Sequence, residues 1–207
     1  MIKEVIDDYI KKDIYPFHMP GHKRLKAEFE DEGANFKDIK RLKEYAVESG
    51  LGLTVKIGGC SALSDMYQAR KAGANTVVAP MVESPYAASK FLKFAKQVFD
   101  KTTRLFVNIE TKYAITYAKD ILEQDLDGII LGRTDLACSL GLGKDAVNSD
   151  EILEIAKEIS GLAKDSGKEF IVGGGVCGLS VSFFLALPYI TGFETRKVIF
   201  DIKSKGK

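Results

Sequence analysis

The sequence predicts an α/β fold, specifically a short TIM-like (β/α) barrel. Short apolar runs rich in β-branched residues alternate along the chain with longer amphipathic segments. This alternation indicates strands of a parallel sheet, each followed by a helix. Nearly every predicted strand ends in charged residues or in glycine, and the carboxyl ends of the strands are where a barrel collects its chemistry.

Composition excludes several classes of protein. The 207 residues, 45% hydrophobic and 29% charged, suit one globular domain, and a formal net charge of +1 provides no field for nucleic acid or an anionic membrane. No segment has the length and apolarity of a transmembrane helix, and the acidic, amphipathic first residues are unlike a signal peptide. The 3 cysteines lack metal-ligand spacing and indicate reduced thiols. We therefore expect a cytoplasmic protein with no nucleic-acid or membrane partner.

The first residues depart from the barrel pattern. Met1–Lys12 has apolar residues at helical spacing, whereas Asp13–Arg24 (DIYPFHMPGHKR) contains prolines and a glycine that favour an extended segment and a turn. The predicted domain organisation is an N-terminal leader over 1–24 and a barrel domain over 25–207.

The strands are predicted from continuous apolar runs. In order, these runs are Leu25–Phe29, Leu51–Ile57, Thr76–Met81, Leu105–Ile109, Gly128–Leu131, Glu169–Val172 and Arg196–Ile202. They total seven, one fewer than a closed barrel needs, so the barrel is either incomplete or completed by an atypical N-terminal strand at Ile14–Phe17. An open doubly wound sheet is the alternative, but the glycine-rich phosphate turn that usually follows its first strand is absent.

The helices are predicted from apolar stripes at helical spacing and from start signals. They cover Phe36–Glu48, Ala62–Ala72, a segment that begins at Pro85, Tyr113–Leu122, Glu151–Lys164 and Leu179–Leu187. Ser84 before Pro85 is a typical N-cap, and Asn148 with Glu151 forms a capping-box pattern for the helix that follows.

Two strands end in carboxylates that form a candidate metal site. The run LFVNIE ends in Glu110, and the run GIILGRTD ends in Asp135. Carboxylates delivered by different strands to one rim can hold a hard cation such as Mg²⁺ (or Mn²⁺), with water and substrate oxygens as the other ligands. Alternatively, each acid caps a helix or pairs with a neighbouring Lys or Arg.

Other charged strand ends supply candidate catalytic residues. Lys56 ends an apolar strand, where a buried cation is costly unless it is paired. It can bind a substrate carboxylate, stabilise an enolate, form a Schiff base or simply pair with a glutamate. Arg133 is a second candidate for neutralising negative charge, and the candidate proton carriers are Glu28, Glu30 and Glu83.

Candidate substrate contacts also lie at strand ends. Gly174 belongs to a glycine run between a strand and a helix, where free N–H groups can cradle a carboxylate, although tight turns use glycine as well. The remaining candidates on the same rim are Gly58, Gly59, Met81 and Ser139.

Three motifs carry a resemblance to a known family. VAPMVES (Val78–Ser84), NIET (Asn108–Thr111) and GRTDLACSLGL (Gly132–Leu142) resemble, in order and spacing, the HpcH/HpaI aldolase and citrate lyase beta-subunit family of pyruvate-type barrels. The resemblance covers about Leu25 to Asp201. It implies that Glu110 and Asp135 are metal ligands and that the protein is a homo-oligomer.

The chain departs from this family at two positions. Lys56 stands where the aldolases have the arginine that stabilises the pyruvate enolate, and Phe29 stands where they have the histidine base. The resemblance therefore supports the metal ligands more directly than the full aldol mechanism. KAEFEDEG, TVKIGGC and GFETRKVIFD are closer to a citrate-lyase-like branch whose reaction the resemblance does not define.

The leader resembles a different class of enzyme. DIYPFHMPGHKR is similar to the opening of the ornithine/lysine/arginine decarboxylases, which use pyridoxal phosphate, but the match ends at about residue 24 and no cofactor lysine motif follows. We do not infer decarboxylation from it.

These observations predict a divalent-metal-dependent carbon–carbon lyase or aldolase. Its partner is a small-molecule carboxylate, a 2-keto acid or a related compound, converted through an enolate. The alternative is a non-catalytic or regulatory barrel that binds a carboxylate or sugar-like ligand within a larger assembly.

Overall fold

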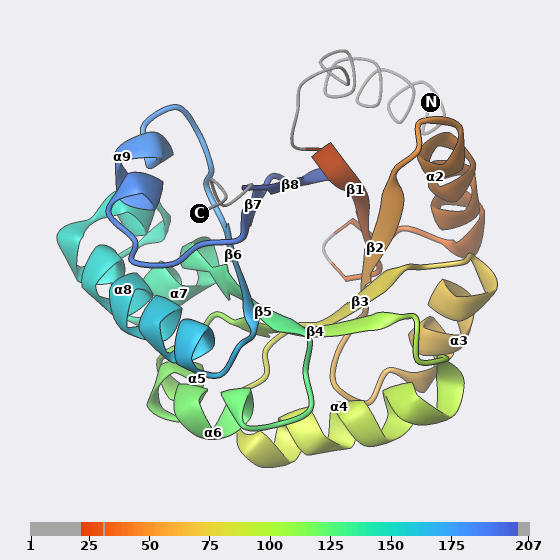
Figure 1. The fold of residues 1–207 in the computed structure, drawn as a ribbon, viewed down its shortest axis with the longest axis horizontal. Coiled ribbons are helices and arrows are strands. Elements are labelled where there is room, and N and C mark those ends of the chain that lie inside the picture. The colour runs from red at the N-terminus through yellow and green to blue at the C-terminus, as the bar shows by residue number, and fades with distance from the viewer. Residues whose placement is uncertain (1–21, 31, 203–207) are drawn as a thin grey trace.

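The computed structural model describes residues 22–30 and 32–202, and this part of the chain forms a closed barrel of eight strands surrounded by helices (Figure 1). The strands are β1 (His22–Glu28), β2 (Gly52–Lys56), β3 (Thr76–Ala79), β4 (Arg104–Ile109), β5 (Gly128–Gly132), β6 (Glu169–Gly173), β7 (Gly192–Glu194) and β8 (Val198–Asp201). The prediction of a TIM-like α/β barrel is confirmed.

The eighth strand makes this barrel a mixed one. Strands β1 to β7 pair in parallel in chain order, whereas β8 is antiparallel to both β7 and β1. The chain therefore turns back at the carboxyl end of β7 through the tight segment 195–197, and no helix separates the last two of the described strands. Stacked rings of Phe193 and Phe200, 4.7 Å apart, hold this hairpin together, and Phe184 extends the stack at 5.3 Å.

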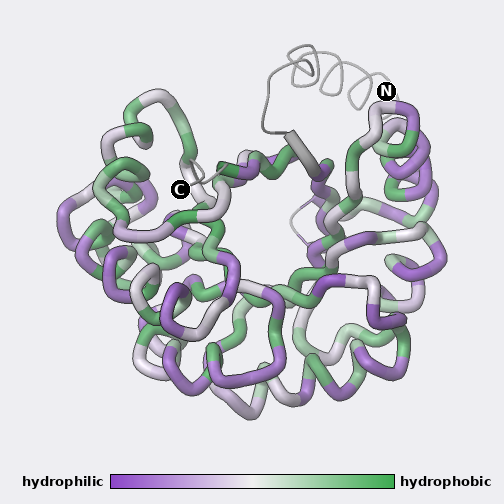
Figure 2. The backbone as a smooth tube through the Cα atoms, viewed as in Figure 1, coloured by the Kyte–Doolittle hydropathy of each residue, from purple (hydrophilic) through white to green (hydrophobic). Residues whose placement is uncertain are grey.

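The helices lie on the outside of the barrel from α2 round to α9, and none of the described helices covers β8 (Figure 1). They are α2 (Phe36–Glu48), α3 (Leu63–Lys71), α4 (Pro85–Val98), α5 (Lys112–Thr116), α6 (Ala118–Leu122), α7 (Arg133–Ser139), the 3₁₀ helix η1 (Lys144–Asn148), α8 (Asp150–Asp165) and α9 (Ser180–Leu185). Hydrophilic and hydrophobic positions alternate along them, as amphipathic helices require (Figure 2). None of the helices in the described residues is long and apolar enough to cross a membrane.

Alternation along the strands produces two apolar layers. On β4, Leu105, Val107 and Ile109 belong to the main core between strands and helices, whereas Phe106 belongs to a separate cluster. That cluster fills the middle of the barrel and consists of Val78, Phe106, Ile130, Ile171 and Ile199. Above and below this cluster, the side chains that point into the barrel are polar. Those at the carboxyl ends of the parallel strands can therefore form a site.

Glycines on the inner face of β5 and β6 make room for side chains from neighbouring strands. A Cβ atom at Gly132 would lie 2.5 Å from Glu110 Oε2, and one at Gly173 would lie 2.9 Å from Glu194 Oε1. These distances are well below ordinary van der Waals contact, so no larger residue fits unless a glutamate moves. The absence of a side chain at these two glycines therefore leaves the space that the Glu110 and Glu194 side chains occupy.

Several predicted boundaries were wrong. The predicted strand Arg196–Ile202 is β8 alone, starting at Val198, and the strand missing from the sequence prediction is β7, whose three residues are too few to show a period. The alternative candidate, Ile14–Phe17, lies outside the described residues. Strand β1 begins at His22 rather than Leu25.

Helix assignments also needed correction. The predicted helix Tyr113–Leu122 is divided into α5 and α6, and α7 was not predicted. The N-cap of α8 is Ser149, whose hydroxyl accepts a hydrogen bond from Ile152 N. The predicted cap, Asn148, instead accepts a hydrogen bond from Arg133 at its Oδ1 atom. Ser84 caps α4 as predicted.

Candidate active site

A cavity of about 450 Å³ opens at the carboxyl ends of the parallel strands. Its wall contains both signs of charge. The charged residues that line it are Lys26, Glu28, Lys56, Glu110, Asp135, Glu194 and Arg196. Side chains from β1, β2, β4 and β7 and from the segments after β5 and β7 therefore converge on one space, as the sequence predicted for barrel strand ends.

Glu110 follows β4 and is held in a defined orientation. Its side chain is buried; Oε1 accepts a hydrogen bond from Met81 N at 2.9 Å, and Oε2 accepts one from Asn108 Nδ2 at 2.7 Å. Met81 has a left-handed backbone with φ 51°, which is uncommon for a residue with a side chain. Each carboxylate oxygen has capacity left to bind a further group.

Burial raises the pKa of Glu110 and the Asp135 carboxylate adds to this, while Lys56 and the two hydrogen bonds oppose it. Because such a carboxylate is costly to ionise, a cation that binds beside it stabilises its charged form. Asp135 lies in the first turn of α7, exposed to solvent on the same cavity.

The oxygen donors of this region fit a hard cation. Glu110 and Asp135 offer carboxylate oxygens, and Asn108 Oδ1 is buried without a hydrogen-bond partner. Within the described residues, no group of three or more His, Cys, Asp or Glu side chains has a geometry that could hold a metal. Two protein carboxylates completed by water and substrate suit Mg²⁺ or Mn²⁺, which retain much of their hydration.

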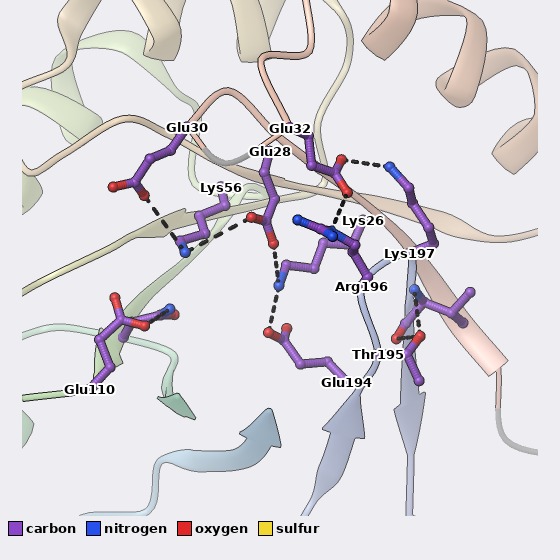
Figure 3. A network of polar contacts seen from close by, with 12 residues as sticks. Lys26, Glu28, Glu30, Glu32, Lys56, Glu110, Glu194, Thr195, Arg196 and Lys197 are labelled. Atoms are coloured by element: carbon purple, nitrogen blue, oxygen red, sulfur yellow. Dashed lines mark hydrogen bonds and ion pairs between the residues drawn. The ribbon is translucent and has the colours of Figure 1, made fainter. Parts of the chain in front are cut away.

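Lys56 ends β2 beside three carboxylates. Its Nζ lies 3.7 Å from Glu30 Oε2 and 4.0 Å from Glu28 Oε2 (Figure 3). Burial alone would lower the pKa of Lys56, but the carboxylates of Glu110 and Glu28 outweigh this and raise it. Lys56 is therefore an ammonium at neutral pH, which supports charge neutralisation and argues against a Schiff-base nucleophile.

Two further charged residues, Lys26 and Glu194, belong to the site, and the sequence prediction assigned a role to neither of them. Lys26 Nζ lies 2.7 Å from Glu28 Oε1 and 2.5 Å from Glu194 Oε1, so it links β1 to β7, the two strands on either side of β8 (Figure 3). A signal for Lys26 existed, because residues two apart on a strand share a face and Glu28 was already a candidate. Burial would raise the pKa of Glu28, but Lys26 outweighs it and lowers it, so Glu28 is ionised at neutral pH.

Arg133 is not brought together with the other predicted catalytic residues or with the candidate metal ligands. Its guanidinium is fully buried and donates to the carbonyl oxygens of Gly173, Val147 and Gly174, to Asn148 Oδ1 and to Ser180 Oγ. It also lies over the ring of Phe183 at 4.7 Å. Burial lowers the pKa of Arg133 to about 10, so it stays charged and anchors the loop after β6 from outside the cavity wall.

The remaining predicted residues divide into two groups. Gly174 lines the cavity. The others lie off its wall: Glu83 and Met81 are exposed, Gly58 N donates to Asp65 Oδ2, and Ser139 Oγ accepts from Lys112 N. Gly59, with φ 155°, is likewise outside the lining.

Comparison with protein families identifies one match. The family described as HpcH/HpaI aldolase/citrate lyase matches residues 45–172, which include both carboxylates of the candidate metal site. Comparison with curated protein sequences gives no match.

Solved structures show the same fold at low sequence identity. An HpcH/HpaI aldolase from Desulfitobacterium hafniense DCB-2 has a TM-score of 0.72 at 15% identity, covering 90% of this chain and 80% of that one. An HpcH/HpaI aldolase/citrate lyase family protein from Burkholderia cenocepacia J2315 has a TM-score of 0.74 at 15% identity, covering 89% and 82%. The citrate synthase SbnG has a TM-score of 0.67 at 16% identity, covering 83% and 76%.

Proposed function

The chain belongs to the HpcH/HpaI aldolase/citrate lyase family of carbon–carbon lyases, and we therefore propose that it is a divalent-metal-dependent lyase or aldolase. Its substrate is a 2-keto acid or a related small carboxylate, and the reaction passes through an enolate. The observation that carries this proposal is the placement of Glu110, Asp135 and Lys56 on one cavity.

Glu110 and Asp135 would hold Mg²⁺ or Mn²⁺. When bound, such a cation acts as a Lewis acid that polarises the keto and carboxylate oxygens of a substrate. Glu110 is oriented for this by Met81 N and Asn108 Nδ2, and its raised pKa reflects a charge that the protein alone does not fully compensate.

Lys56 would neutralise negative charge on the substrate. Its amine is protonated at neutral pH, and it interacts electrostatically with Glu110. It stands on the strand where the aldolases of the resembled family have an arginine. A single ammonium cannot form the bidentate contact of a guanidinium. We therefore expect weaker orientation of the enolate than an arginine provides.

Glu28 is the proposed proton carrier on the cavity wall. The side chain at the position of the missing histidine, Phe29, packs against the main core and cannot move a proton. Glu28 is ionised, so it can accept a proton, although Lys26 makes it a weak base. Glu83, another predicted carrier, is exposed and off the cavity wall.

The test measures metal binding and enolisation separately. Calorimetry with Mn²⁺ should detect binding that Glu110→Gln and Asp135→Asn each weaken by about tenfold or more, since each removes a charged ligand. Nuclear magnetic resonance should detect Mn²⁺-dependent exchange of the pyruvate methyl protons with D₂O, abolished in Glu110→Gln. Glu169→Gln is the matched control, because Glu169 pairs with Arg104 at the opposite end of the barrel.

Two outcomes would contradict the proposal. Unchanged Mn²⁺ affinity in both variants would remove the metal site. Metal-dependent pyruvate binding with no exchange, and no turnover over a panel that includes oxaloacetate, would instead support a non-catalytic barrel.

We also propose that the protein is a cytoplasmic homo-oligomer, which light scattering of the purified protein and fractionation of cells would test.

A further inference from the structure

Glu194 and Lys26 form a second polar position in the cavity. They come from β7 and β1, the strands on either side of β8, whereas Glu110 follows β4. In a closed barrel of eight strands in chain order, β4 is opposite β8. The pair therefore lies on the side of the cavity that faces Glu110 (Figure 3).

Glu194 presents an unused acceptor to this cavity. The residue is only 6% exposed; Oε1 accepts from Lys26, while Oε2 is buried and has no hydrogen-bond partner among the described residues. A buried charged oxygen without a donor is costly. The side chain lies close against Gly173, because a Cβ atom there would be only 2.8 Å from Glu194 Cγ.

Lys26 supplies a donor at the same place. Its ammonium has three N–H groups, and the carboxylates of Glu28 and Glu194 account for two of them. Burial alone would lower the pKa of Lys26, but these carboxylates raise it, so the group remains a donor and does not become a free amine. A free acceptor and a free donor thus lie side by side.

We propose that Glu194 Oε2 and Lys26 Nζ bind a hydroxyl group of the substrate, on the side of the cavity opposite Glu110. A hydroxyl both donates and accepts one hydrogen bond, which matches this pair. Because Glu194 and Lys26 place opposite charges side by side, a neutral group suits this position better than an anion or an ammonium does. Glu194 is then a specificity-determining residue, and this inference rests on the proposed function because the keto-acid end occupies the metal side.

The test uses pairs of probes that differ by one hydroxyl. Pyruvate is compared with 3-hydroxypyruvate, and 2-oxobutanoate with 4-hydroxy-2-oxobutanoate, whose hydroxyl is one carbon further from the carboxylate. Affinities are measured by calorimetry in the presence of Mn²⁺, and the titrated solution is assayed for pyruvate so that cleavage of 4-hydroxy-2-oxobutanoate is not counted as binding. In the wild type, the hydroxylated member of at least one pair should bind about tenfold more tightly, which corresponds to about 1.4 kcal/mol.

The variants assign this preference to Glu194. Glu194→Ala should reduce the preference to less than about threefold, because the acceptor is gone. Glu194→Gln keeps a carbonyl acceptor and should retain part of the preference, and it also remains informative if the alanine variant does not fold. Glu169→Gln should leave the preference unchanged, because it removes a barrel glutamate at the opposite end.

The outcomes separate this inference from the proposed function. Equal affinity within both pairs in the wild type, no detectable binding of the hydroxylated probes, or a preference that survives Glu194→Ala would overturn the hydroxyl position. Any of these can occur while Mn²⁺ still binds to Glu110 and Asp135. Loss of Mn²⁺ binding would be seen independently in the titration with metal alone.

Discussion

Replacing Gly132 with alanine tests whether the barrel interior positions Glu110. The added Cβ would lie 2.8 Å from Glu110 Cβ and 2.5 Å from its Oε2, whereas ordinary contact begins near 3.4 Å. Glu110 or β5 must therefore move by about 0.6 Å or more at a position where both are buried. Overpacking of this kind costs about 1–3 kcal/mol. For a chain of this length, that lowers Tm by roughly 2–4 °C per kcal/mol.

The same substitution should weaken metal binding without removing a ligand. A shift of Glu110 disturbs its hydrogen bonds from Met81 N and Asn108 Nδ2, and changes in such orienting contacts lower metal affinity by about 10–100-fold. Urea unfolding measures the stability, and calorimetry with Mn²⁺ measures the affinity.

Gly161→Ala is the matched control. Gly161 lies within α8, and a Cβ added there meets no atom within 4 Å. Because alanine favours the helix, this variant should gain about 0.5–1 kcal/mol and keep its Mn²⁺ affinity. If Gly132→Ala unfolds at the wild-type urea concentration and binds Mn²⁺ equally well, the steric argument is refuted.

Two further predictions concern buried charges. The pKa of Glu28 is lowered from 4.5 in the folded state, so its contribution to stability is present above pH 4.5 and is lost as the pH falls through the folded value. The stability difference between wild type and Glu28→Gln, measured by urea unfolding, should therefore shrink as the pH is lowered below about 4.5; a difference that grows would contradict the ion pair with Lys26. Arg133→Met should cost about 3 kcal/mol or more, because buried carbonyl oxygens lose their donors, including that of Gly174; a loss below about 1 kcal/mol would contradict an anchoring role.

Sequence reasoning succeeded where local pattern and parallel topology coincide. Glu110 and Asp135 are 25 residues apart, yet both follow apolar runs that parallel strands carry to the same rim. Lys56 was predicted for the same reason. The family motifs around these acids strengthened the prediction, and the family match confirms the resemblance.

Sequence reasoning failed where a side chain's direction depends on distant elements. Arg133 and Asp135 are two residues apart, but Asp135 lines the cavity while Arg133 extends beneath the loop after β6. In the sequence, Lys26 looks like an exposed position of a strand, but in the structure it is buried inside the barrel. Glu194 belongs to a strand too short to be recognised, and its neighbour in space, Gly173, is 21 residues away in the chain.

Local patterns in the sequence are enough to predict the class of fold, seven of the eight described strands and the two carboxylates of the candidate metal site, because apolar periodicity and strand ends are local properties. How the barrel closes depends on tertiary contacts, since β8 pairs with β1 across nearly the whole chain in an antiparallel sense that no local pattern records. That closure places β7 and β1 on either side of β8, and it brings Glu194 against Lys26. The hydroxyl position proposed here exists because two strands from opposite ends of the chain meet.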